Sequence, residues 1–142
     1  MKKRFASVAL GLLLAPAAGA ADTTVKVVAH PAVPGTQIRR GTLADVFLGR
    51  TSRLANGQPI VPVDQSSQSS VRAAFSESVL AQPVAAVQAH WIREIHNRRR
   101  PPLTRGSDAE VMAFVAANRG AIGYVSNSTA IDAGVKEVQV IQ

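Results

Sequence analysis

Residues 63–75, with the sequence VDQSSQSSVRAAF, contain the polar side chains of this chain that are best spaced to bind a ligand. Uncharged hydroxyl and amide groups run without interruption from Gln65 to Ser70, a segment that we call the serine turn, and Arg72 follows shortly after it. If a helix begins directly after such a turn, its first backbone N–H groups and the positive end of its dipole favour an anion. The pattern therefore has two interpretations: an anion-binding turn at a helix N-terminus, or a serine-rich surface loop.

The segments on either side of the serine turn help to decide between these interpretations. Residues 60–63 are apolar and predict a strand, in which Pro62 indicates an edge position or a bulge. After the turn the apolar spacing changes to the helical period, because Val71, Phe75 and Val79 would share one helix face. A strand, a polar turn and a helix in this order are typical of ligand sites in α/β domains, so the order favours anion binding.

The candidate site follows from this geometry. The apolar helix face must turn toward the core, which leaves the first turn of the helix at the surface. We therefore expect the backbone N–H groups of Val71 and Arg72 to point into a shallow polar pocket. The candidate ligand-binding residues are Gln65 and Ser66 on the rim of this pocket, Ser69 and Ser70 at the start of the helix, and Arg72 as the source of positive charge.

The rest of the chain alternates between strand and helix patterns. We expect strands over residues 24–30, 60–63, 121–125 and 137–142, and helices over residues 41–49 and from residues 69, 83 and 107 onward. The helix from residue 83 should bury a stripe of Val84, Val87, Trp91 and Ile95, and the helix from residue 107 should start with a capping box of Ser107 and Glu110. This alternation predicts an α/β fold, a single layered domain with a mixed sheet flanked by helices.

The first residues have the layout of a secretory signal peptide. Basic residues 2–4 precede the apolar run 8–14, and small residues end at Ala20 or Ala21. The alternative, a buried N-terminal helix, fits less well because Pro16 interrupts the segment. We expect residues 1–21 to be cleaved on export to the periplasm, leaving residues 22–142 as one domain without stable membrane insertion.

Composition excludes several classes of function. The chain has no cysteine, and its formal net charge is +7. The expected cleavage removes three positive charges and leaves a net charge of about +4. This charge is too small to indicate nucleic-acid binding. His30, His90 and His96 do not have the spacing of metal ligands. The sequence also lacks the common catalytic motifs. We therefore expect no enzyme activity, no metal and no cofactor.

Basic residues between positions 98 and 105 are a second possible interaction site. The segment RRRPPLTR could contact anionic lipid, nucleic acid or an acidic partner, or it could be a solvated loop. Since no aromatic residue alternates with the arginines, nucleic-acid binding is not favoured. The single tryptophan, Trp91, has helical spacing with core residues and is interpreted as part of the core.

Several segments together resemble a known protein family. LADVFLGR, PIVPVDQSSQSSVRAAF, Trp91, RRRPP and SDAEVMAFVAANRGAIGYV resemble, in that order, the later part of the phosphate-binding proteins that serve bacterial ABC phosphate importers. Those proteins are type II periplasmic binding proteins, and the resemblance covers residues 25–142. It implies that this domain corresponds to one part of a two-lobed receptor that holds phosphate between its lobes.

The resemblance also implies which family contacts differ here. The family's second phosphate loop, R-S-D-G-S-G-T, aligns with residues 65–71, so that Gln65 replaces the arginine, Val71 replaces the threonine, and Ser66 and Ser69 are identical. Nothing in this chain corresponds to the family's first phosphate loop. Because micromolar binding needs about 8 kcal/mol and each hydrogen bond to a charged group contributes about 1.5–3 kcal/mol, we expect any oxyanion to bind weakly.

Two functions remain open at this point. The first is an exported module that resembles solute-binding proteins and binds phosphate or another small oxyanion weakly, in connection with phosphate uptake and an ABC permease. The alternative is a periplasmic interaction or scaffold protein that docks on an envelope partner. For that partner, the strand near Pro62 and the strand at residues 138–141 are the expected contact surfaces.

Overall fold

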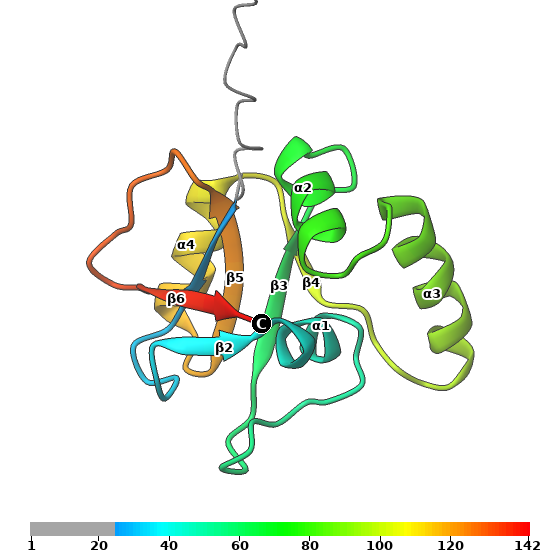
Figure 1. The fold of residues 1–142 in the computed structure, drawn as a ribbon, viewed down its shortest axis with the longest axis horizontal. Helices are drawn as coiled ribbons and strands as arrows, with labels where there is room; N and C mark the ends of the chain where they lie inside the picture. Colours follow the sequence, from blue (N-terminus) through cyan, green and yellow to red (C-terminus); the bar gives the residue numbers. More distant parts are fainter. Residues whose placement is uncertain (1–24) are drawn as a thin grey trace, which may run out of the picture.

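The computed structural model describes residues 25–142 (Figure 1). The predicted signal peptide, residues 1–21, lies outside the described residues. Within them, no helix has the length and apolar character needed to cross a membrane.

Within residues 25–142 the strands form one mixed sheet in the order β2-β6-β1-β5-β3-β4. The strands are β1 (Val25–Ala29), β2 (Gln37–Arg39), β3 (Val61–Gln65), β4 (Leu103–Arg105), β5 (Ala121–Ser126) and β6 (Lys136–Ile141). β1 runs antiparallel to both of its neighbours, β5 and β6. β3 runs parallel to β4 and β5, and β2 runs parallel to β6.

Helices cover both faces of this sheet. They are α1 (Arg40–Phe47), α2 (Ser70–Ser78), α3 (Val84–His96) and α4 (Asp108–Ala117). On one face α4 packs through Val111 and Val115 against Val28, Val63 and Val125 of the strands. On the other face, α1, α2 and α3 enclose the larger core, which includes residues of β1 and β5. The prediction of a single α/β layered domain with a mixed sheet is confirmed.

Local capping sets the start of α4 as the sequence predicts. The Ser107 hydroxyl accepts a hydrogen bond from the Glu110 backbone N–H at 3.2 Å. The Glu110 carboxylate accepts from the backbone N–H of Gly106 at 2.8 Å. The helix therefore begins beside the end of β4, and its first turn lies close to the ends of β3 and β5.

Two short strands were not expected from the sequence. β2 and β4 each contain three residues, and β4 lies within the segment that the sequence analysis treats as an exposed loop. β4 pairs with the last part of β3, in the register Val63 to Leu103 and Gln65 to Arg105. Pro62 lies just before this pairing, and its strand partner is Ile122 of β5, which agrees with a local edge at the proline.

The buried stripe predicted for α3 is wrong at its C-terminal end. Val87 and Trp91 are buried, but Ile95 is 55% exposed and its neighbour Ile92 is 65% exposed. The reason is that α3 packs against α2 at the side of the domain and does not lie along the sheet (Figure 1). Trp91 anchors it over Gly49, where an added Cβ atom would lie only 2.6 Å from the indole ring.

Candidate ligand-binding site

The serine turn joins the end of β3 to a capped helix, as predicted. The Ser69 hydroxyl accepts hydrogen bonds from the backbone N–H groups of Val71, at 3.1 Å, and Arg72, at 3.3 Å. α2 then starts at Ser70. These are the two N–H groups that were expected to point toward an anion, and both already donate to the Ser69 hydroxyl. Ser69 satisfies the donors that a ligand would otherwise use.

Arg72 was expected to supply a free positive charge, but the structure pairs it with Asp64. Its side chain is buried, with 7% of the residue exposed. The guanidinium Nη1 atom lies 3.2 Å from the Asp64 Oδ2 atom and donates a hydrogen bond of 2.9 Å to the backbone carbonyl of Gln65. The buried residues of α2 are Arg72, Phe75 and Ser76, whereas Val71 is only partly buried. The helix is therefore rotated relative to the predicted face, and the rotation takes Arg72 inward.

Gln65 is also buried, which contradicts the expected position on the rim. Its amide nitrogen donates to the Asp108 carboxylate at 2.8 Å and to the backbone carbonyl of Tyr124 at 3.0 Å. Its amide oxygen accepts from the Ser69 hydroxyl at 3.0 Å. This side chain therefore connects β3, α2, α4 and β5. The connection explains why a polar side chain is 2% exposed at this position.

The remaining candidates lie nearer to solvent. Ser66 is partly buried, and its hydroxyl accepts from the backbone N–H of Gln68 at 3.3 Å. Ser70 is exposed at the first position of α2. The structure thus brings Gln65 and Ser69 into direct contact, while the hydroxyls of Ser66 and Ser70 stay at the surface. A role of these five candidates in ligand binding remains a prediction.

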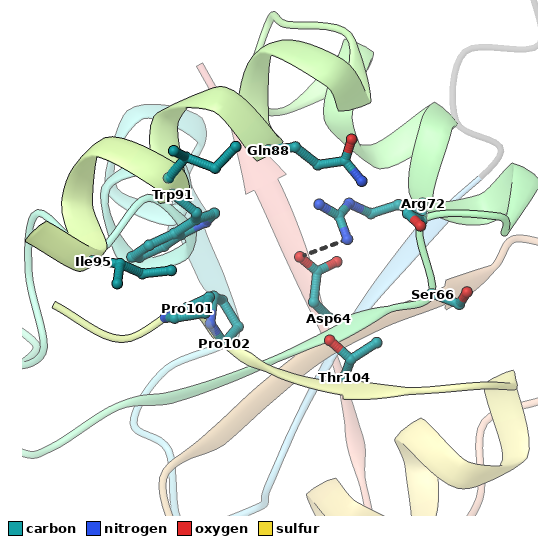
Figure 2. Close-up of a pocket in the computed structure, with 11 residues that line it drawn as sticks. Asp64, Ser66, Arg72, Gln88, Trp91, Ile95, Pro101, Pro102 and Thr104 are labelled. Atoms are coloured by element: carbon teal, nitrogen blue, oxygen red, sulfur yellow. Dashed lines mark ion pairs between the residues drawn. The ribbon is translucent and has the colours of Figure 1, made fainter.

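Asp64 is the site residue that the sequence analysis missed. Its Oδ1 atom accepts hydrogen bonds from the backbone N–H of Gln65, at 2.9 Å, and from the Tyr124 hydroxyl. Its Oδ2 atom faces Arg72 (Figure 2). An available signal was the single carboxylate at the end of an apolar strand, eight positions before an arginine on the following helix.

Burial is the largest influence on the pKa of the Asp64 carboxyl. Burial raises the pKa of the Asp64 carboxyl, while the Arg72 guanidinium, the Tyr124 hydroxyl and the Gln65 N–H oppose this rise. Burial, together with the neighbouring Asp64, also raises the pKa of the Tyr124 hydroxyl. Tyr124 therefore stays protonated and donates its hydrogen bond to Asp64 across the physiological pH range.

The Asp64–Arg72 pair forms one wall of a cavity of about 570 Å³ between α2, α3 and β4 (Figure 2). Ser66 and Ser67 of the serine turn border the same cavity. Its opposite wall is apolar and comes from Trp91, Ile95 and the prolines after α3. The candidate site therefore includes a hollow beside the turn, with polar and apolar sides. A shallow polar pocket at this turn was expected, but its apolar side was not, because that side comes from α3 and the segment after it.

The described part of the chain offers no cluster of His, Asp and Glu that could hold a metal ion. His30 directly follows β1, whereas His90 and His96 both lie on α3. The His90 Nε2–H group donates a hydrogen bond of 2.8 Å to the backbone carbonyl of Leu48, and the His30 Nδ1 atom accepts one of 2.9 Å from the backbone N–H of Ala32. The rings of His30 and His90 therefore each have a structural role, a hydrogen bond to a backbone group.

Known structures match this arrangement of strands and helices. An ABC-type phosphate transport receptor from Vibrio cholerae has a TM-score of 0.64 and 21% sequence identity over 82% of this chain. A phosphate ABC transporter substrate-binding protein from Clostridium perfringens, solved with bound phosphate, has a TM-score of 0.63 and 20% identity over 82% of the chain. PstS from Borrelia burgdorferi has a TM-score of 0.64 and 16% identity over 82%.

The chain has the fold of one part of a phosphate-binding receptor. It spans less than half of each of these three proteins, namely 46%, 44% and 47% of their chains. No protein-family model and no curated protein sequence matches the chain. At these low identities the likeness to phosphate-binding receptors concerns the fold, and function must be argued from the residues of this chain.

Proposed function

We propose that this chain is an exported binding module, not an enzyme, that holds a small oxyanion such as phosphate weakly at the serine turn. The observation that carries this proposal is the position of the turn. It lies between the end of β3 and the capped start of α2, in a domain with the fold of phosphate-binding receptors. A helix start in such a place favours an anion through its dipole. The surface hydroxyls of Ser66, Ser67 and Ser70 are the available donors.

We expect weak binding because the charged and backbone donors near the serine turn already have partners within the protein. The positive charge of Arg72 is offset by Asp64, and the N–H groups at the start of α2 donate to Ser69. An oxyanion would therefore receive a few hydroxyl hydrogen bonds and the attraction of the dipole. Hydrogen bonds of about 1.5 kcal/mol each support a dissociation constant on the order of 1 mM rather than 1 μM.

Calorimetric titration of the chain with phosphate, sulfate and acetate tests this proposal. We expect saturable binding of phosphate in the millimolar range, weakened in a variant that combines Ser66→Ala and Ser70→Ala. The matched control is Ser52→Ala, which removes an exposed serine hydroxyl elsewhere in the domain. Absence of saturable binding at tens of millimolar, or equal binding by all variants, would reject the serine turn as the oxyanion site.

A specific surface favours the second candidate function, a non-transport periplasmic interaction or scaffold protein that docks on an envelope partner. Val140 and Ile141 on β6 are each 37% exposed, next to the edge strand β2. Apolar side chains beside a sheet edge are a common contact surface. Cross-linking in the cell envelope through a photoreactive residue at position 141 would test this function. Recovery of a specific partner supports it, and a strict monomer without any cross-linked partner counts against it.

A further inference from the structure

Exposed apolar side chains gather on one part of the surface. Within residues 25–142 five large hydrophobic side chains are exposed, and three of them are Ile92 at 65%, Ile95 at 55% and Leu103 at 51%. The prolines after α3 connect them, because these prolines line one hollow with Ile92 and Ile95 and a second hollow with Leu103. The three side chains therefore belong to one apolar surface, formed by the end of α3 and the segment that follows it.

Most of the net positive charge of the domain lies on the same segment. Residues 93–105 contain five arginines and one glutamate, whereas the other residues between 25 and 142 contain eight basic and seven acidic side chains. The glutamate, Glu94, pairs with Arg99 at 3.2 Å. Three further arginines of the segment are exposed and form no ion pair within the described part of the chain: Arg93, Arg98 and Arg100. Their charge is available to an anionic partner.

Arginines beside exposed aliphatic side chains suit the surface of an anionic phospholipid membrane. The planar guanidinium group can bond two phosphate oxygens at once, while the stem of arginine lies along apolar surface. Isoleucine and leucine leave water when they enter the boundary between headgroups and acyl chains. Each basic residue near an anionic lipid surface strengthens binding about fivefold, so three unpaired arginines together contribute on the order of a hundredfold.

The position of α3 in the fold favours a membrane over a protein partner. α3 packs against α2 at the side of the domain, and the chain between α3 and β4 forms an outer edge of the molecule (Figure 1). An edge that projects in this way can lie against a planar lipid surface. Protein contact surfaces are enriched in exposed aromatic side chains, whereas the tryptophan of α3, Trp91, is 7% exposed.

We propose that this surface, which we call the α3 patch, binds the headgroup layer of an anionic phospholipid membrane. The α3 patch consists of Ile92, Ile95, Leu103, Arg93, Arg98 and Arg100. The aliphatic side chains enter the headgroup layer, and the arginines bond the lipid phosphates. Ser66 and Ser67 of the serine turn border the neighbouring cavity and take no part in this contact.

Sedimentation with lipid vesicles tests this contact. The exported protein is mixed with vesicles of phosphatidylcholine alone, or with vesicles of phosphatidylcholine and phosphatidylglycerol in equal parts. We expect binding to the anionic vesicles to be roughly tenfold tighter or more, and to weaken as salt is added, because salt screens exposed charges. Equal binding to both kinds of vesicle, or no binding to the anionic ones, would overturn the proposal.

Charge variants connect vesicle binding to the α3 patch. A triple variant with Arg93→Gln, Arg98→Gln and Arg100→Gln should bind anionic vesicles on the order of a hundredfold more weakly than the wild type. The matched control loses the same net charge from exposed arginines in other segments: Arg39→Gln, Arg53→Gln and Arg119→Gln. All variants keep the wild-type N-terminus, so residues 1–21 contribute equally to each. Equal losses in the two triple variants would show that binding follows net charge and not the patch.

Apolar variants test the second component of the contact. Ile92→Ser and Ile95→Ser alter exposed side chains and should each weaken binding to anionic vesicles by roughly threefold or more. The matched control, Ile141→Ser, should bind these vesicles as the wild type does. Wild-type binding by both α3 variants would contradict insertion of the patch into the headgroup layer.

Two other results would assign the contact elsewhere. The variant that combines Ser66→Ala and Ser70→Ala should bind vesicles as the wild type does, even if it no longer binds inorganic phosphate. Loss of vesicle binding in this variant would place the lipid phosphates at the serine turn and overturn the proposal. A photoreactive residue at position 98 that captures an acidic envelope protein, in a chain that does not bind anionic vesicles, would show that the patch contacts protein instead of lipid.

Discussion

The Asp64 Oδ2 atom and the Arg72 Nη1 atom lie 3.2 Å apart, and both side chains are only 8% exposed. This ion pair connects the end of β3 to the first turn of α2, directly below the serine turn. It withdraws the positive charge of Arg72 from the surface, and it also supplies the polar side of the neighbouring cavity. The same contact therefore weakens oxyanion binding at the serine turn and shapes the cavity beside it.

Breaking the ion pair from one side should strongly destabilise the domain. Arg72→Met leaves the Asp64 carboxylate buried without its partner, and we expect the free energy of unfolding to fall by about 3–5 kcal/mol. Chemical denaturation measures this change. The double variant Asp64→Asn with Arg72→Met removes both charges, keeps an acceptor oxygen for Tyr124 and Gln65, and should recover much of the loss. A loss below about 1 kcal/mol in the single variant would show that the ion pair is more solvated than its 8% exposed side chains indicate.

The Ser69 cap should contribute measurably to stability. Ser69→Ala removes the acceptor for two N–H groups of α2 and the contact with Gln65, so we expect a loss of about 1 kcal/mol or slightly more. Thermal or chemical denaturation can detect this loss. Ser67→Ala is the matched control, because Ser67 is exposed in the same turn. Equal stability of the two variants would place the start of the helix elsewhere.

Gly123 should tolerate no side chain. A Cβ atom at this position on β5 would lie 2.7 Å from Val63 Cγ1 and 2.8 Å from Val111 Cγ1, between the sheet and α4. We expect Gly123→Ala to lower the free energy of unfolding by about 1–3 kcal/mol through overpacking. In contrast, Gly41→Ala in α1 meets no atom within 4 Å and should be neutral or stabilising. Similar effects of the two alanines would contradict the packing of α4 on β5.

Asp108 should make stability depend on acid pH. Burial tends to raise the pKa of this carboxyl, but hydrogen bonds from Thr129, Gln65 and the Ser126 N–H outweigh burial and lower the pKa below its ordinary value of 3.8. Because the folded pKa is the lower one, the stabilisation is complete above the unfolded value and is lost as the pH falls through the folded pKa.

Urea denaturation of the wild type and Asp108→Asn at a series of pH values measures this effect. The asparagine variant should be less stable at pH 7, and the difference should narrow as the pH falls below 3.8. Asp132→Asn, at an exposed position, is the control and should change stability little at pH 7. A difference that stays constant or widens toward low pH would contradict the hydrogen-bonded role of Asp108.

Patterns that depend on near neighbours in the chain were predictable from the sequence alone. The apolar runs of β1, β3, β5 and β6, the helix that starts after Ser69, and the capping box of Ser107 and Glu110 are all set within a few residues. Their alternation was enough to predict the α/β class. The leader at residues 1–21 is also a local pattern, and it remains a prediction.

Only the tertiary structure decided which way the polar residues face. Val71 and Arg72 are adjacent on a short helix, so a small rotation exchanges which of them is buried, and helical periodicity cannot resolve it. Asp64 decides that Arg72 is the buried residue, because a carboxylate at the end of β3 makes burial of the Arg72 guanidinium possible. Likewise β4 exists only beside β3, and the exposure of Ile95 depends on where α3 ends against α2. These outcomes depend on contacts between distant segments, which local sequence patterns do not contain.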